Sequence, residues 1–251
     1  RPEELAYSSL LFIKFEIPLI EGKPVRRYKR FLADVVLADG RETTVHCPNT
    51  GSMKNCVEVN QVVWLSIADN PKRKHKYTWE YIRTCRGHTI GVNTARANQL
   101  VVDAVNAGCI IELTGYKDFY REVKYGKENS RIDLLLKSPN QTDCYVEVKS
   151  VTLLEDPASK GIGYFPDAVS ERGAKHLREL ESMARVGKRA VLFFCVQHTG
   201  VKEVRPADHI DVRYGELLRQ VQAAGVEALA YKVRVTPAGF KLWRSVPLVL
   251  G

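Results

Sequence analysis

Two acidic residues stand inside short apolar runs that are typical of buried strands. Asp133 interrupts Arg131-Ile-Asp-Leu-Leu-Leu136, and Glu147, fourteen positions later, interrupts Cys144-Tyr-Val-Glu-Val-Lys-Ser150. Residues i and i+2 of a strand point to the same face, so Glu147 and Lys149 share a face, and a neighbouring strand can bring Asp133 alongside them. Burying two carboxylates and an amine among Ile, Leu and Val is costly without a purpose. The pattern predicts a divalent-metal site with a water-activating lysine, the minimum for cutting a phosphodiester bond.

A Glu-x-Lys pair by itself is weak evidence, because exposed strands often carry such pairs as solvated ion pairs worth less than about 1 kcal/mol. Here Val146 and Val148 bracket the pair. Mg²⁺ or Mn²⁺ prefers hard oxygen ligands, and the candidates are Asp133, Glu147 and the carbonyl oxygen of Val148. The metal would lower the pKa of a bound water and offset charge on the phosphate. Lys149 is then expected to position or deprotonate that water.

Length and composition set broad limits. A chain of 251 residues with 45% hydrophobic and 27% charged residues is typical of one or two globular domains. The longest apolar stretch, Ala190–Val196, is far too short to cross a bilayer, and the first residues show no secretory pattern, so we expect no membrane association. Six cysteines without a CxxC pair predict reduced thiols, no zinc site and a cytoplasmic location.

The net charge of +9 is concentrated in two runs. The residues predicted to bind phosphates or nucleic acid are Lys23, Arg26, Arg27, Lys29 and Arg30 in the first run, and Lys72, Arg73, Lys74 and Lys76 in the second. Such runs attract polyanions, although each also suits a solvated loop on a basic protein. Aromatic residues stand beside them and favour nucleic acid, because bases stack on exposed rings: Tyr28, Phe31, Tyr77, Trp79 and Tyr81.

The first part of the chain resembles a small β-barrel. Strands are predicted at 10–15, 30–37, 42–47 and 59–67, with turns at 21–24, at the hairpin pair Asp39-Gly40, and at Pro48-Asn-Thr-Gly51, where Gly51 is expected to take a positive φ. Short strands at this spacing fit a five-stranded oligonucleotide-binding (OB) barrel, which we assign to residues 1–85.

Residues 86–251 show a different pattern, which predicts an α/β domain with a central mixed sheet. Asn93 or Thr94 begins a predicted helix that ends near Ala107. The strands 119–125, 130–136 and 144–151, a long loop at 152–166 and a helix from Asp167 or Ala168 to Val186 follow. The last predicted elements are a strand at 189–196, a helix at 214–224 and a strand at 226–235.

Ile132-Asp133 followed by Glu147-Val-Lys149 and a helix resembles the PD-(D/E)xK nuclease core. Three longer stretches resemble the sugar fermentation stimulation protein A family: residues 46–53, residues 130–133 with 147–153, and residues 165–177. This resemblance implies an N-terminal OB-like barrel, a C-terminal nuclease-like domain, DNA binding, and a link to the regulation of sugar-utilisation genes.

The third stretch adds candidates for phosphate binding. Arg172, Lys175 and His176 project from the first turns of the helix, where a helix N-terminus and cations suit a phosphate. Asp167 is the expected helix cap. Such nucleases often carry a further acid upstream, for which Glu122 is the candidate.

Two functions from different classes therefore remain open. The first is a nuclease that depends on Mg²⁺ or Mn²⁺, hydrolyses DNA or RNA and has little sequence specificity. The second is a DNA-binding transcriptional regulator of sugar (maltose) metabolism that keeps a nuclease fold without catalysis. The absence of a helix-turn-helix signature favours the first.

Overall fold

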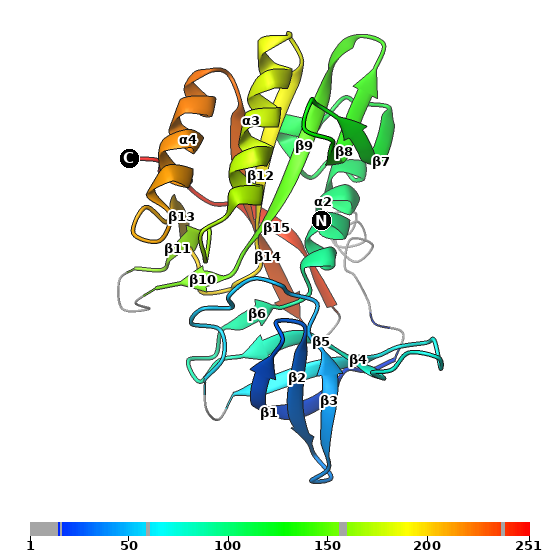
Figure 1. Ribbon diagram of the computed structural model, residues 1–251. Helices are drawn as coiled ribbons and strands as arrows, with labels where there is room; N and C mark the ends of the chain where they lie inside the picture. The colour runs from blue at the N-terminus through cyan, green and yellow to red at the C-terminus, as the bar shows by residue number, and fades with distance from the viewer. Residues whose placement is uncertain (1–14, 16, 59–60, 156–159, 237–238) are drawn as a thin grey trace, which may run out of the picture.

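The computed structural model describes residues 15, 17–58, 61–155, 160–236 and 239–251. Figure 1 shows a β-barrel, blue to cyan, joined to a larger α/β domain, green to red. This confirms the fold class predicted from the sequence. The predicted strand at 10–15 falls outside the described residues except for Phe15, and the division at residues 85 and 86 stays a prediction.

Five strands close the barrel: β1 (Ile20–Tyr28), β2 (Leu32–Leu37), β3 (Glu42–His46), β4 (Val62–Ile67) and β5 (Tyr77–Arg83). Their order is β3-β2-β1-β4-β5, and a β3–β5 pairing closes the ring, while β6 (Thr89–Gly91) extends it from β5. The predicted Asp39-Gly40 hairpin is confirmed, with Gly40 at φ 84° between β2 and β3.

The turn predicted at 21–24 is wrong, because these residues lie inside β1. Gly22 is needed there for close packing, since a Cβ atom would lie 2.4 Å from Cγ1 of Val35. Pro24 precedes a register shift in the β1–β2 ladder, and bulges are where strands tolerate proline. Glycine and proline therefore mark a tightly packed, irregular strand here, and not a turn.

The α/β domain is built on a six-stranded mixed sheet of order β15-β14-β12-β9-β8-β7. Strands β9, β12 and β14 run parallel, and the others are antiparallel to their neighbours. The strands are β7 (Asp118–Tyr125), β8 (Ser130–Ser138), β9 (Gln141–Val151), β12 (Arg189–Val196), β14 (Glu227–Thr236) and β15 (Gly239–Ser245).

Helices cover both faces of this sheet (Figure 1). On one face, α2 (Thr94–Asn106) buries Leu100 and Val101 in the same core cluster as Phe193. On the other, α3 (Glu171–Arg185) and α4 (Val212–Ala223) bury Leu177 and Leu218. A short 3-10 helix, η1 (Ile111–Leu113), follows α2. None of the helices in the described ranges is long and apolar enough to span a membrane.

The segment predicted as one long loop at 152–166 contains two short strands, β10 (Leu153–Leu154) and β11 (Ile162–Phe165). They form a three-stranded sheet with β13 (Glu203–Pro206), which the sequence analysis missed. The predicted start of α3 at Asp167 or Ala168 is also wrong. Ser170 is the N-cap, and its hydroxyl accepts a hydrogen bond from the amide of Gly173.

Candidate functional site

Asp133 lies where β8 and β9 separate. Their last paired residues toward the site are Leu134 and Val146, so the backbone amide of Val148 has no ladder partner on β8. The Asp133 carboxylate accepts this amide at 2.7 Å and also accepts the side-chain amide of Asn98, on α2, at 2.8 Å. Asp133 is thus fixed between a strand and a helix, with its carboxylate beside β9.

Glu147 and Lys149 share a face of β9, as the strand period predicts. The Lys149 ammonium lies 2.7 Å from Oε1 of Glu147 and 2.7 Å from Nδ1 of His176, on α3. The same His176 nitrogen also contacts Oε1 of Glu147. Glu147 is only 2% exposed, and its second oxygen, Oε2, is buried without any hydrogen-bond partner. A buried carboxylate oxygen without a partner is costly, so a cation or a water at this atom would stabilise the site.

The two carboxyl groups have pKa values moved in opposite directions. Burial, together with the charge of Glu147, raises the pKa of Asp133 to about 6. For Glu147, burial alone would raise the pKa. The hydrogen bond with His176 and the positive charge of Lys149 outweigh burial and hold the pKa of Glu147 below its ordinary value. A metal-free site therefore carries one firmly ionised carboxylate beside one that takes up a proton readily.

These groups line a cavity of about 380 Å³ between the two domains. From the α/β domain come the ends of β8 and β9, the start of α2, and Arg172 near the start of α3. From the barrel comes the loop Asn49–Gly51. The catalytic candidates of one domain thus face a loop of the other.

Gly51 does not take the positive φ that the sequence analysis expected, and residues 48–51 form no hydrogen-bonded backbone turn. Glycine fits closely there, because a Cβ atom would lie 3.0 Å from Oδ1 of Asn49 and 3.0 Å from Oδ2 of Asp167, tighter than most Cβ contacts. The guanidinium of Arg27 donates to the carbonyl oxygens of Asn49 and Gly51, each at 2.7 Å. Arg27, predicted to bind phosphate, is therefore engaged in fixing this loop.

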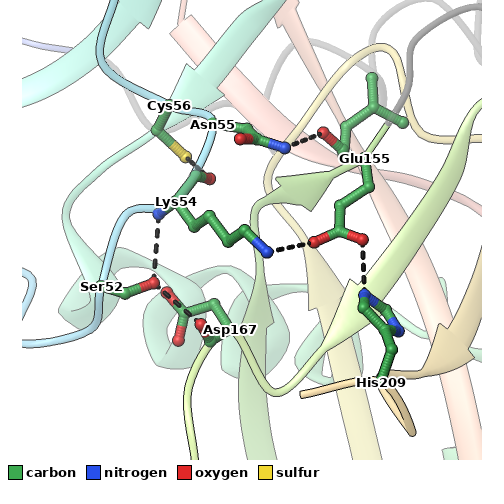
Figure 2. A network of polar contacts seen from close by, with 8 residues as sticks. Ser52, Lys54, Asn55, Cys56, Glu155, Asp167 and His209 are labelled. Atoms are coloured by element: carbon green, nitrogen blue, oxygen red, sulfur yellow. Dashed lines mark hydrogen bonds and ion pairs between the residues drawn. The ribbon is translucent and has the colours of Figure 1, made fainter.

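Polar contacts attach the segment after this loop to the α/β domain, as Figure 2 shows. The hydroxyl of Ser52 donates to the carbonyl oxygen of Asp167 at 2.9 Å. The Asp167 carboxylate accepts the amide of Met53 at 3.2 Å, which explains why Asp167 does not cap α3. Lys54 and His209 both contact the carboxylate of Glu155 (Figure 2). The junction thus has defined partners on both sides.

Of the other predicted site residues, the structure brings some to the cavity and not others. Arg172 is exposed and lines it, whereas Lys175 is half-buried on α3. His176 is buried against Glu147 and Lys149 and is not a surface cation. Glu122 is exposed on the edge strand β7 and does not line the cavity.

The two basic runs, more than 40 positions apart in the sequence, meet at a second cavity of about 450 Å³. It is lined by Lys29, Phe31, Leu32, His46, Arg73, Lys74 and His75. Phe31 is 48% exposed, so its ring is available for stacking. The expectation that Trp79 and Tyr81 stack on bases is wrong, because both lie buried in β5. Arg26 is held by Asp34 through an ion pair of 2.7 Å, while Lys23, Arg30, Lys72 and Lys76 are exposed.

The donor set at the first cavity fits a hard divalent cation. Asp133 and Glu147 offer carboxylate oxygens, and Oε2 of Glu147 has no other partner. In the described part of the chain no three His, Cys, Asp or Glu side chains are grouped as a metal site. Further ligands would therefore have to be backbone oxygens, water or substrate phosphate, as is common for Mg²⁺. The role of the Val148 carbonyl stays a prediction.

Asn98 is the site residue that sequence analysis missed. It contacts Asp133 and lines the cavity from the second turn of α2. Its spacing of four from Thr94, which also lines the cavity, places both on one side of the helix. An amide one turn after Thr94, on the same side of the helix, was the available signal.

Comparisons with known proteins agree with this architecture. Residues 25–92 match the family described as SfsA N-terminal OB domain, and residues 95–239 match the Sugar fermentation stimulation protein RE domain. The sugar fermentation stimulation protein homolog of Shewanella loihica is 58% identical over 233 residues, which are 93% of this chain and 98% of that protein. The homolog of Shewanella frigidimarina is 56% identical over 238 residues, 95% of this chain and 100% of that protein.

Among solved structures, SfsA of Pyrococcus furiosus in complex with Ca²⁺ has a TM-score of 0.84 with 24% identity. The match covers 95% of this chain and 99% of that chain. At this level of identity the likeness shows the fold, including both domains.

Proposed function

The chain belongs to the sugar fermentation stimulation protein family, and from this premise we propose that it binds nucleic acid and hydrolyses phosphodiester bonds with a divalent metal, Mg²⁺ or Mn²⁺. The observation that carries the proposal is the buried Glu147 oxygen Oε2, which has no partner, on a carboxylate that lines the same cavity as Asp133. Such a cavity suits a cation held by two carboxylates. The related protein solved with Ca²⁺ supports a hard, oxygen-preferring ion.

Each group has a distinct role in this proposal. Asp133 and Glu147 would hold the metal, which when bound lowers the pKa of a water ligand and offsets charge on the phosphate. The Lys149 ammonium is fixed between Glu147 and His176, so it is positioned to orient the attacking water or to donate to a phosphate oxygen. His176 acts as a positioning residue through these two contacts. Asn98 and the Val148 amide keep Asp133 in place.

The substrate would enter between the domains. Arg172 at the mouth of the cavity supplies a cation near the N-terminus of α3, a favourable place for a phosphate. The second cavity, with Phe31 among Lys29, Arg73 and Lys74, suits a base and its flanking phosphates. Such contacts track the backbone and read little sequence, which favours a nonspecific nuclease.

The test is incubation of the wild type and Lys149→Met with labelled single- and double-stranded DNA and RNA, in Mg²⁺, Mn²⁺ or EDTA. We expect cleavage that requires metal and is lost in Lys149→Met. Lys188→Met serves as a matched control, because Lys188 is an exposed lysine that precedes β12, at the end of the sheet far from the cavity. Intact substrate in every lane, with binding retained in a gel shift, would refute hydrolysis and favour a DNA-binding regulator.

A further inference from the structure

Away from the cavity lined by Asp133 and Glu147, Lys232 is a mostly buried lysine whose ammonium has no acceptor among the described residues. It lies on β14, where it pairs with Val196 of β12, and it is only 6% exposed. Among the described residues, no hydrogen bond or ion pair to its ammonium is present. The stem of Lys232 is buried, whereas its ammonium is not among the fully buried polar atoms and stays within reach of solvent. Lys232 can therefore bind an external anion without first breaking a contact to another described residue.

The surroundings of Lys232 add positive charge. Arg244 stands directly opposite on β15, and like charges at paired positions of an antiparallel sheet destabilise it. Burial lowers the pKa of Lys232, and the charges of Arg244 and Lys202 lower it further, with no acidic group among the described residues opposing them. Both Lys202 and Arg244 are exposed, so this cluster of cations opens onto the surface.

His198 contributes a neutral donor to the same place. Its Nδ1 accepts the amide of Gly200 at 3.0 Å, so the ring carries its proton on Nε2. Burial, followed by the charges of His88 and Lys232, lowers the pKa of His198 to about 3, and the ring is neutral near pH 7. His88 comes from the barrel turn before β6, with its ring 5.6 Å from that of His198. The cluster thus lies at the junction of the two domains.

The cluster also lies on the same edge of the sheet as the catalytic cavity. Val151 of β9 pairs with Val196 of β12, which pairs with Lys232 of β14. Two strand spacings amount to roughly 10 Å. Val151 is two residues beyond Lys149, so a polynucleotide held at the cavity could place a neighbouring phosphate over the cluster.

We propose that Lys202, Lys232 and Arg244, with His198, form a phosphate-binding site at this junction. Three cations and one N–H donor suit a tetrahedral oxyanion, which offers oxygens in several directions, better than a planar carboxylate. The phosphate would be that of a nucleic-acid backbone or a free phosphate. Occupation by a nucleic-acid phosphate rests on the proposed function, whereas the ability of the site to bind phosphate does not.

The first experiment uses neither nucleic acid nor metal. Thermal unfolding is compared in inorganic phosphate and in chloride at equal ionic strength, for the wild type, Lys232→Met, Arg244→Ala and the control Lys188→Met. With phosphate tenfold above its Kd, we expect the midpoint to rise by about 3–6 °C for the wild type and the control. Lys232→Met and Arg244→Ala should lose most of this rise. Equal rises in all four proteins, or none in the wild type, would overturn the proposal.

Arg244→Ala keeps the test decisive if Lys232→Met folds poorly, because Arg244 is exposed.

A second measurement distinguishes the two sources of phosphate. The affinity for single-stranded DNA is measured at several salt concentrations. If a backbone phosphate occupies the site, the association constant for single-stranded DNA should depend less on salt in Lys232→Met. The negative slope of its logarithm against the logarithm of the salt concentration should become smaller in magnitude by about 0.7. An unchanged slope, with the phosphate effect retained in the wild type, would assign the site to free phosphate. Loss of cleavage activity alone would not bear on either result.

Discussion

Replacing Asp133 by asparagine should stabilise the metal-free protein at neutral pH. Asp133 has its pKa raised to about 6 by burial and by the charge of Glu147, so its ionised form is disfavoured in the folded state. Asparagine has nearly the same shape and can still accept the amide of Val148. The side-chain amide of Asn98 can rotate to present its oxygen to the new NH₂ group. The substitution therefore removes a buried charge and keeps both contacts.

The size and pH range follow from proton linkage. In the unfolded chain the carboxyl of Asp133 titrates near its ordinary pKa of 3.8, so between pH 3.8 and about 6 the folded state binds more protons than the unfolded one. The free energy of unfolding of the wild type therefore falls as pH rises through this range. A difference of about 2 pKa units corresponds to about 3 kcal/mol. Asp133→Asn has no carboxyl group at this position, so its free energy of unfolding does not fall in this way. The difference between the variant and the wild type should therefore grow from pH 4 to pH 7 and then stay constant.

The assay is urea unfolding of both proteins in EDTA at pH 5, 6, 7 and 8, followed by the same series in Mg²⁺ or Mn²⁺. A metal held by Asp133 and Glu147 binds only the folded state, and at a hundredfold excess over its Kd it adds about 2.7 kcal/mol to the wild type. Asp133→Asn should gain little from metal. The stability advantage of the variant should thus shrink or disappear once metal is present.

The opposite result would refute this reasoning. If Asp133→Asn is less stable than the wild type by more than about 1 kcal/mol at pH 7 in EDTA, the ionised carboxylate stabilises the fold. Asp133 would then be a structural acceptor for the Val148 amide, and its electrostatic strain would not be evidence for a cation. Glu147→Gln makes a useful comparison, because the pKa of Glu147 is held low by His176 and Lys149. Loss of the Glu147 carboxylate should destabilise the metal-free protein.

Three further substitutions test other parts of the structure. Phe31→Ala should weaken single-stranded DNA or RNA binding by about 1–3 kcal/mol, measured by fluorescence anisotropy, because one stacking ring is lost at the second cavity. Gly51→Ala should lower the free energy of unfolding by about 1–3 kcal/mol in urea, because the new Cβ would press on Asn49 and Asp167. Glu179→Ala should cost about 3 kcal/mol or more in urea unfolding, because this buried carboxylate accepts two backbone amides of the β7–β8 turn.

The shared face of Glu147 and Lys149 on β9 could be predicted because strand periodicity is local. Two apolar runs with one acid each, and a lysine two positions on, define a shared face without knowledge of the rest of the chain. The strand at 189–196 was likewise bounded correctly, since its residues are apolar on both faces. By contrast, β5 was missed because its aromatic residues follow a basic run and were assigned to base stacking. Burial of Trp79 depends on the closed barrel, which a local pattern does not reveal.

Asp167 shows why the junction between the domains lay beyond local rules. Both Asp167 and Ser170 satisfy the chemistry of a helix N-cap, and Asp167 was the candidate considered. In the fold, Ser170 caps α3, and Asp167 accepts the amide of Met53, 114 positions earlier in the chain. The same contact brings the 49–51 loop against the cavity that Asp133 and Glu147 line. A residue that looks redundant in a local motif is therefore a good candidate for a long-range contact, and here that contact completes the proposed active site.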